Sequence, residues 1–246
     1  MCATCGCDGD TGVRVAAPHR HDHEHPHPHA PATETVTLEQ RVLAKNDRLA
    51  SGIRDRLARR RILAVNLMSA PGAGKTTLLE RTIRETGAAR PVAVIEGDQE
   101  TVLDADRIRR TGCAVVQVNT GAGCHLDAAM MSDALDRLDP ADGSLLFVEN
   151  VGNLVCPALF DLGEAAKVVI ISVTEGTDKP LKYPYMFAVA DLVVINKVDL
   201  IRYVDFDLDA CRAHVAAVNP RADVVAVSAT TGDNLAAWLG WLADRS

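Results

Sequence analysis

The sequence predicts an α/β fold in which helices cover both faces of a doubly wound, mostly parallel sheet of about seven strands. Seven short apolar segments recur along the chain after residue 61, and most of them contain no polar residue. Uninterrupted apolar strands are typical of parallel sheets, because helices cover both faces of such a sheet. Amphipathic segments of helical period lie between several of the strands, which gives the repeated strand–helix pattern.

Composition limits the classes of function. The chain has 246 residues, 48 % of them hydrophobic, which is enough for one α/β domain with residues to spare. Acidic residues outnumber basic ones by 33 to 26, and the net charge of -7 argues against a general nucleic-acid binder. No apolar run approaches the length of a membrane span, since Val168–Val173, which Ser172 interrupts, is only strand-sized, and the first residues lack the pattern of a signal peptide. We therefore expect a cytoplasmic protein that binds neither nucleic acid nor membrane.

Changes in composition divide the chain into three parts. Residues 1–34 have almost no bulky apolar side chains, so we expect a Cys/His-rich tail that is disordered without metal. Residues 35–61 carry apolar side chains at helical spacing and predict an N-terminal helix, and residues 62–246 form the strand–helix domain. Arginines crowd the end of the helix, where they suit either the helix dipole or an acidic partner. They are Arg54, Arg56, Arg59, Arg60 and Arg61.

Within the strand–helix domain, each strand is expected where apolar residues follow one another. The predicted strands are Ile62–Met68, Val92–Ile95, Ala114–Val118, Leu145–Val148, Val168–Val173, Leu192–Ile195 and Val224–Val227. The predicted helices between them include Thr76–Thr86, Val102–Arg110 and Leu126–Leu138. In such a sheet the carboxyl ends of the strands lie at one edge, where ligands bind.

The tail carries two kinds of metal ligand. Three thiolates lie close together and, with a terminal amine or an amide nitrogen, complete a four-coordinate site: Cys2, Cys5 and Cys7. A planar set suits Ni²⁺ or Cu²⁺ and a tetrahedral set suits Zn²⁺, whereas the alternative is a merely reactive cysteine cluster. Imidazoles at alternate positions add weak ligands that suit metal storage. They belong to His19, His21, His23, His25, His27 and His29.

The segment Ser69–Thr77 has the pattern of a phosphate-binding loop between a strand and a helix. Its glycines let backbone N–H groups point at phosphate oxygens, and the dipole of the following helix adds positive potential. Lys75 is expected to reach the β- and γ-phosphates, and the hydroxyl of Thr76 to ligate Mg²⁺. Ser69 departs from the motif, which usually begins with Gly. The expected nucleotide contacts are Gly72, Ala73, Gly74, Lys75, Thr76 and Thr77.

A second motif, Asn196-Lys-Val-Asp, follows a later apolar strand and favours recognition of guanine. The carboxylate of Asp199 can accept hydrogen bonds from N1–H and from the exocyclic amine of guanine, so it selects GTP over ATP. Asn196 is expected to brace the surrounding loops, and the stem of Lys197 to cover the base. Ser228 and Ala229 follow the last strand, where a second loop that contacts the base is expected.

Acidic residues end two other strands of the predicted sheet. Asp98 and Glu149 are expected beside the phosphates, where they hold the Mg²⁺ shell or orient the attacking water. The alternative is that these acids merely cap the next element. Gly152 is expected to offer its amide to the γ-phosphate and so to sense its loss. The predicted catalytic residues are therefore Lys75, Thr76, Asp98 and Glu149.

A further set of metal-binding residues lies within the strand–helix domain. Cys124 and His125 are adjacent and precede a helix, and Cys156 lies in a later loop. For each cysteine alone a core position is the alternative, but together the three residues favour a Ni²⁺ or Zn²⁺ site. Three ligands leave one position open or shared across a dimer axis. Cys113 and Cys211 are expected in the core.

Taken in order, these motifs resemble the HypB family of hydrogenase nickel-incorporation GTPases, which belongs to the SIMIBI class of P-loop GTPases. The resemblance covers nearly the whole chain, and its most specific parts are Glu149–Pro157 and the pair Cys124-His125. It implies a maturation factor that delivers Ni²⁺ to the large subunit of nickel–iron hydrogenase. It also implies GTP-dependent dimerisation and a partner chaperone that binds nickel. Finally, it implies a tight nickel site at Cys2, Cys5 and Cys7 and a weaker Ni/Zn site, at the dimer interface, at Cys124, His125 and Cys156.

Two alternative functions stay open from the sequence alone. A similar GTPase could serve another nickel enzyme such as urease, but urease-type relatives carry Cys-Pro-His where this chain has Cys156-Pro157-Ala158. The protein could also be mainly a nickel store with a slow GTPase switch, which the histidine tract favours. GTP turnover measured with and without Ni²⁺ separates storage from nucleotide-gated delivery.

Overall fold

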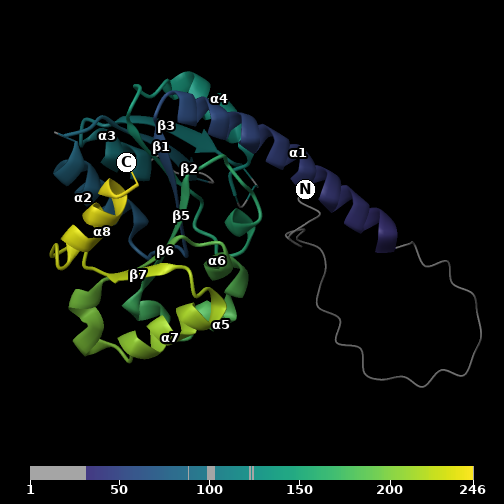
Figure 1. The fold of residues 1–246 in the computed structure, drawn as a ribbon. Coiled ribbons are helices and arrows are strands. Elements are labelled where there is room, and N and C mark those ends of the chain that lie inside the picture. Colours follow the sequence, from purple (N-terminus) through teal and green to yellow (C-terminus); the bar gives the residue numbers. More distant parts are fainter. Residues whose placement is uncertain (1–31, 88, 99–102, 122, 124, 246) are drawn as a thin grey trace, which may run out of the picture.

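The computed structural model describes residues 32–87, 89–98, 103–121, 123 and 125–245 (Figure 1). The predictions for Cys2, Cys5, Cys7, Cys124 and the six histidines from His19 to His29 lie outside these residues. Within the described part, seven strands form one sheet in which every pairing is parallel. The predicted α/β fold with a doubly wound sheet is therefore confirmed.

The strands lie in the order β3-β2-β4-β1-β5-β6-β7. Their bounds are β1 Leu63–Ser69, β2 Val92–Asp98, β3 Ala114–Asn119, β4 Leu145–Glu149, β5 Ala166–Ser172, β6 Leu192–Asn196 and β7 Asp223–Ala226. After β3 the chain returns to place β4 beside β1, and β5 then pairs on the other side of β1. This reversal opens a crevice at the carboxyl ends of β1 and β4, and such crevices are where α/β sheets bind ligands.

Helices lie on both faces of the sheet (Figure 1). They are α1 Ala32–Arg59, α2 Lys75–Thr86, α3 Leu103–Arg109, α4 Ala128–Leu138, α5 Lys179–Lys182, α6 Pro184–Ala188, α7 Leu208–Val218 and α8 Leu235–Ala243. Short 3₁₀ turns are η1 Cys156–Ala158, η2 Val173–Glu175 and η3 Val198–Tyr203. Side chains alternate along β1, so that Val65 and Leu67 pack with α2, α3 and α8. Ala64 packs with α1 and α4, and Met68 packs with α6 and α7.

The second half of helix α1 packs on the rest of the domain, and its first half projects away from it (Figure 1). Ala50, Ile53 and Leu57 are buried against the sheet and α4. Arg54 forms an ion pair with Asp161 at 2.7 Å, and Arg60 forms one with Asp142 at 2.6 Å. Partners within the chain thus account for these two arginines of the cluster, without an acidic partner protein.

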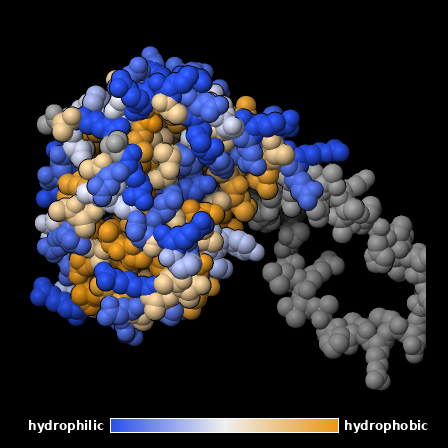
Figure 2. Space-filling model, viewed as in Figure 1, coloured by the Kyte–Doolittle hydropathy of each residue, from blue (hydrophilic) through white to orange (hydrophobic). Residues whose placement is uncertain are grey.

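The face of the molecule in Figure 2 mixes hydrophilic and hydrophobic residues, and apolar residues show most over its lower half, near α5, α6 and α7. Three large side chains of these elements and of η3 are exposed: Leu181 on α5, Tyr185 on α6 and Tyr203 in η3. None of the helices in the described part is both long enough and apolar enough to cross a bilayer.

Candidate functional site

The loop between β1 and α2 is held in the conformation that its glycines allow. Gly74 has φ +95°, and a Cβ built there would lie 2.5 Å from Nδ2 of Asn196, so no other residue fits without a shift. The ammonium of Lys75 donates to the hydroxyl of Ser69 at 3.1 Å, and that hydroxyl donates to the carbonyl of Ala70. Ser69, where the motif usually has Gly, therefore orients the lysine.

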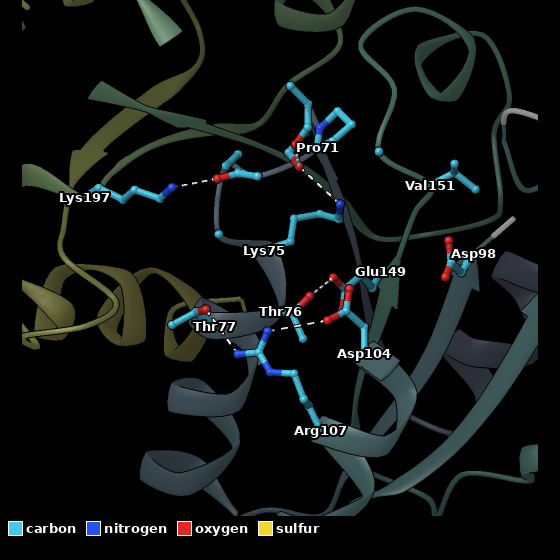
Figure 3. A pocket seen from close by; sticks show the side chains of 16 residues that line it. Pro71, Lys75, Thr76, Thr77, Asp98, Asp104, Arg107, Glu149, Val151 and Lys197 are labelled. Atoms are coloured by element: carbon cyan, nitrogen blue, oxygen red, sulfur yellow. Dashed lines mark hydrogen bonds and ion pairs between the residues drawn. The ribbon is translucent and has the colours of Figure 1, made fainter. Parts of the chain in front are cut away.

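A cleft of about 450 Å³ opens above this loop, which is a size typical of ligand sites (Figure 3). The residues predicted to contact the phosphates or Mg²⁺ line it: Gly72, Ala73, Gly74, Lys75, Thr76, Thr77, Asp98, Glu149 and Gly152. Lys197, predicted to cover the base, lines it as well. Gly152 packs directly on the loop, because a Cβ at this glycine would lie 3.0 Å from the ring of Pro71. The loop after β4 is therefore in contact with the loop after β1.

Glu149 is the buried acid of the cleft. It is 3 % exposed, and its Oε1 accepts a hydrogen bond from the hydroxyl of Thr76 at 2.6 Å. Burial raises the pKa of Glu149, while the charge of Lys75 and the bond from Thr76 oppose this shift. Its Oε2 is buried and has no hydrogen-bond partner among the described residues. A divalent cation is the kind of ligand that such an oxygen and a nearby hydroxyl suit.

Glu96 is a second buried acid beside the cleft, and the sequence did not single it out as a site residue. It pairs with Glu149 in the register of β2 and β4 and is likewise 3 % exposed. Burial first, and then the charges of Glu149 and Asp98, raise the pKa of Glu96 to about 8. Burial among other acids therefore favours the protonated form of the Glu96 carboxyl. The pairing of β2 with β4, which brings the two acids together, could not be found from sequence spacing.

Asp104 and Arg107 also line the cleft, and the sequence analysis did not predict either (Figure 3). Arg107 donates to the hydroxyl of Thr77 at 3.2 Å and to Glu80 at 2.8 Å. Its guanidinium therefore reaches the loop from α3, opposite Lys75. The only signal in the sequence is the spacing of three between Asp104 and Arg107, which puts both on one face of a short helix.

Asn196 joins the two loops of the predicted nucleotide site. Its Nδ2 donates to the carbonyl of Ala73 at 3.0 Å, and its Oδ1 accepts from the N–H of Ala229 at 3.1 Å. Lys197 donates from its ammonium to the carbonyl of Gly72 at 2.7 Å (Figure 3). The geometry agrees with the bracing role predicted for Asn196.

The predicted base-reading residues lie beside the cleft rather than in its lining. One oxygen of Asp199, Oδ1, is buried and has no hydrogen-bond partner among the described residues. Ser228 is buried, and its hydroxyl accepts from the N–H of Thr231 at 3.1 Å. Ala229 follows and is tied to Asn196. A buried carboxylate oxygen without a hydrogen-bond donor destabilises the protein unless a ligand supplies one. A base that offers two N–H groups to Asp199 would supply this donor.

The second predicted metal site is described only in part, because Cys124 lies outside the described residues. His125 stacks on Phe160 with ring centroids 3.9 Å apart, so it contacts the segment that begins at the buried Cys156. Burial lowers the pKa of His125, which keeps the imidazole neutral and able to bind metal. No group of three or more potential ligands is assembled among the described residues.

The two cysteines expected in the core differ in their burial. Cys211 is fully buried, whereas Cys113 is only half-buried and packs at the margin of the core. The thiol of Cys113 donates to the carbonyl of Val92 at 3.1 Å. Burial raises the pKa of both thiols to about 11, so without a metal both stay protonated at neutral pH.

Comparison with known proteins gives one consistent result. The family model described as "CobW/HypB/UreG, nucleotide-binding domain" matches residues 63–226. The hydrogenase maturation factor HypB of Azotobacter vinelandii is 58 % identical over 205 residues, which cover 83 % of this chain and 68 % of that protein. The crystal structure of this factor from Archaeoglobus fulgidus has a TM-score of 0.77 at 43 % identity and covers 82 % of this chain and 98 % of its own. The structure of HypB from Helicobacter pylori in complex with nickel has a TM-score of 0.77 at 37 % identity, covering 82 % and 94 %.

Proposed function

Because the chain belongs to the CobW/HypB/UreG family, among its hydrogenase maturation factors of the HypB type, we propose that GTP hydrolysis in the cleft controls the binding and release of Ni²⁺. The cargo is nickel destined for nickel–iron hydrogenase. The observation that carries this proposal is the loop after β4, which touches the phosphate-binding loop through Gly152 and reaches Cys156 four residues later. One short segment, from Gly152 to Cys156, therefore connects the phosphate-binding loop to a proposed metal ligand.

The residues of the cleft suit the hydrolysis of GTP to GDP and phosphate. We assign Lys75 to the β- and γ-phosphates, where its charge offsets the negative charge that develops during transfer. The backbone N–H groups from Gly72 to Thr77 cradle the phosphates at the start of α2. Asp98 or Glu149 orients the attacking water, and both stand at strand ends that face the cleft. Gly152 offers its amide to the γ-phosphate.

Mg²⁺ fits the residues that are present. Thr76, Glu149 and Asp98 would hold it, and the buried, unpartnered Oε2 of Glu149 supports this assignment. When bound, the ion supplies positive charge that stabilises the phosphate oxygens. Asp199 reads guanine through its unpartnered buried oxygen, while Asn196, Lys197, Ser228 and Ala229 hold the loops around the base.

We assign the cargo to two places. Cys2, Cys5 and Cys7 provide the tight thiolate site, and the six histidines between His19 and His29 add weak storage ligands. Cys124, His125 and Cys156 provide the weaker site, which accepts Ni²⁺ or Zn²⁺. The contact between His125 and the segment after Cys156 supports the weaker site.

The proposed partners follow from the same function. Three ligands at the weaker site leave one position to be shared, so we propose a homodimer that depends on nucleotide and metal. Nickel delivery in the cytoplasm requires the hydrogenase large subunit as acceptor, and we propose a nickel-binding chaperone as the second partner. We therefore propose three functional units. They are the tail of residues 1–34, the helix segment of residues 35–61 and the GTPase domain of residues 62–246.

The experiment that tests the proposal is a nickel titration of the full chain with GDP and with a non-hydrolysable GTP analogue. The affinity of the weaker nickel site should differ between the two states by about 5- to 150-fold, which is the usual range of coupling between two sites. Cys156→Ala should abolish this difference. Cys211→Ala is the matched control, because Cys211 is a buried cysteine on α7 that the site does not use. Equal nickel affinities in both states of the wild type would refute the proposed control by GTP.

A further inference from the structure

A buried asparagine connects the nucleotide cleft to the segment that carries His125. Asn150 is 1 % exposed and follows Glu149 at the end of β4. Its Oδ1 accepts hydrogen bonds from two backbone N–H groups, that of Val151 at 3.0 Å and that of Leu126 at 3.3 Å. Its Nδ2 donates to Oδ1 of Asn66 at 3.3 Å. One side chain therefore holds two loops that are 24 residues apart in the sequence.

The two N–H groups belong to two segments, one beside the nucleotide cleft and one beside the proposed metal ligand His125. Val151 lines the cleft, and the next residue, Gly152, packs on Pro71 of the phosphate-binding loop. Leu126 follows His125 directly, and its side chain is fully buried against the sheet. A displacement of Val151 toward or away from the phosphates therefore changes the position of the oxygen that also holds Leu126.

The network continues to the segment after Cys156. Asn66 on β1 donates from Nδ2 to Oε1 of Glu164 at 3.1 Å, and the N–H of Leu162 donates to Oε2 of the same carboxyl at 2.7 Å. Asn66 and Glu164 are both buried. The polar chain from Asn150 to Leu162 thus reaches both segments that contain the described metal ligands, and it meets the lining of the cleft at Val151.

Because the network is buried, its hydrogen bonds cannot be replaced gradually by bonds to water. A buried N–H that loses its acceptor has no water to replace it, so each bond is either kept or exchanged for another. Leu126 and Val151 share one oxygen, and neither can move far without loosening the other. Interfaces of this kind convert a small shift at one site into a discrete change at another.

We propose that Asn150 is the positioning residue that transmits the state of the nucleotide from the loop after β4 to the His125 segment. The residue contacts neither nucleotide nor metal, and it acts by fixing Leu126 relative to Val151. This inference rests on the proposed control of nickel binding by GTP and names the side chain through which that control passes.

The test compares nickel affinity at the weaker site, in the full chain, with GDP and with the non-hydrolysable GTP analogue. Asn150→Ala removes the shared oxygen, so the ratio of the two affinities should fall from its wild-type value to within about twofold of one. Asn150→Asp keeps an acceptor for the N–H groups of Leu126 and Val151, so it should retain more of the ratio than Asn150→Ala, although the buried carboxylate facing Asn66 lowers stability. Recovery by the aspartate is not expected if Asn150 serves stability alone.

Asn219→Ala is the matched control. Asn219 is also a buried asparagine, and its Nδ2 donates to the carbonyls of Phe187 and Ala190 at 3.0 and 2.9 Å, away from both sites. Its loss should lower the melting temperature and leave the affinity ratio unchanged. A wild-type ratio of one would refute the proposed function, and with it this inference. A wild-type ratio well above one that survives in Asn150→Ala would refute the inference alone.

A second measurement does not depend on folding of the variant. Amide hydrogen exchange of the wild-type chain should show that protection of the Leu126 and Val151 N–H groups changes together between the GDP state and the GTP-analogue state. A change at Val151 with no change at Leu126 would overturn the proposal, because the shared oxygen would then transmit nothing.

Discussion

Asn196→Ala is expected to weaken both the fold and nucleotide binding, because one side chain joins the phosphate-binding loop to the base loop. The substitution removes the donor to Ala73 and the acceptor for the N–H groups of Lys197 and Ala229. Asn196 is only 1 % exposed, so water does not replace these bonds in the folded protein. The buried carbonyl of Ala73 and the buried N–H of Ala229 are then left without their partners, whereas the N–H of Lys197 is only partly buried.

The size of the effect follows from these contacts. A buried group left without its partner costs about 1–3 kcal/mol, so two such groups predict a loss of roughly 2–6 kcal/mol in the free energy of unfolding. For a chain of this size each kcal/mol lowers the melting temperature by about 2–4 °C, which predicts a fall of roughly 4–24 °C. Loosening of both loops should also weaken binding of a GTP analogue by about tenfold or more.

Thermal melting and titration of the GTP analogue check this prediction on the same preparations. Asn196→Asp keeps the acceptor for Ala229 but sets a buried carboxylate oxygen against the carbonyl of Ala73, so it should also lower the melting temperature. Asn219→Ala controls for the removal of a buried asparagine elsewhere and should leave nucleotide affinity unchanged. If Asn196→Ala lowers the melting temperature as much as Asn219→Ala does but binds the analogue within about twofold of wild type, the bracing argument is wrong.

Three further predictions concern single side chains. Lys75→Ala should lower GTP turnover by about 10²-fold or more with the fold intact, and near-normal turnover would refute its role at the phosphates. Asp199→Asn should lose GTP and gain xanthosine triphosphate, since a mismatched buried contact costs about 1–3 kcal/mol; a competition assay checks this. Burial raises the pKa of the Cys211 thiol from about 9 to about 11. Above pH 9 the unfolded chain therefore loses a proton that the folded chain keeps, so the free energy of unfolding should fall as the pH rises from about 9 to 11. Denaturation curves for wild type and Cys211→Ala should show a weaker fall in the variant.

The strands could be predicted from the sequence because each is a run of apolar residues long enough to cross the core. Their ends could not, because hydrogen bonding continues past the apolar residues. β2 was predicted over Val92–Ile95, but it extends to Asp98 because the backbone pairs with β3 through that residue.

The segment from Glu175 to Pro184 has the Lys and Pro content of a loop, yet it forms α5 and begins α6. Each of these helices has a proline in its first turn, where the missing N–H costs nothing.

The candidate site could be predicted only as far as its residues belong to local motifs. Lys75, Thr76 and Gly152 lie in the cleft because each closely follows a strand that ends at it. Glu96 and Arg107 could not be identified, since their place depends on which strands and helices become neighbours. The partner of Glu96 is Glu149, which lies far away in the chain and pairs with it only because β4 inserts beside β2.

The same chemistry recurs wherever loops meet at the edge of this sheet. Asn46 on α1 donates to the carbonyl of Asp161 at 2.8 Å and accepts from the N–H of Ala128 at 2.9 Å. Asn150 and Asn196 likewise bond two separate segments, and all three are buried. A side-chain amide carries a donor and an acceptor on one short, uncharged group, so it can join a carbonyl to an N–H without the cost of burying a charge. Aspartate lacks the donor and leucine lacks both. A few uncharged amides therefore hold separate segments of this fold together at positions where a buried charge would be costly.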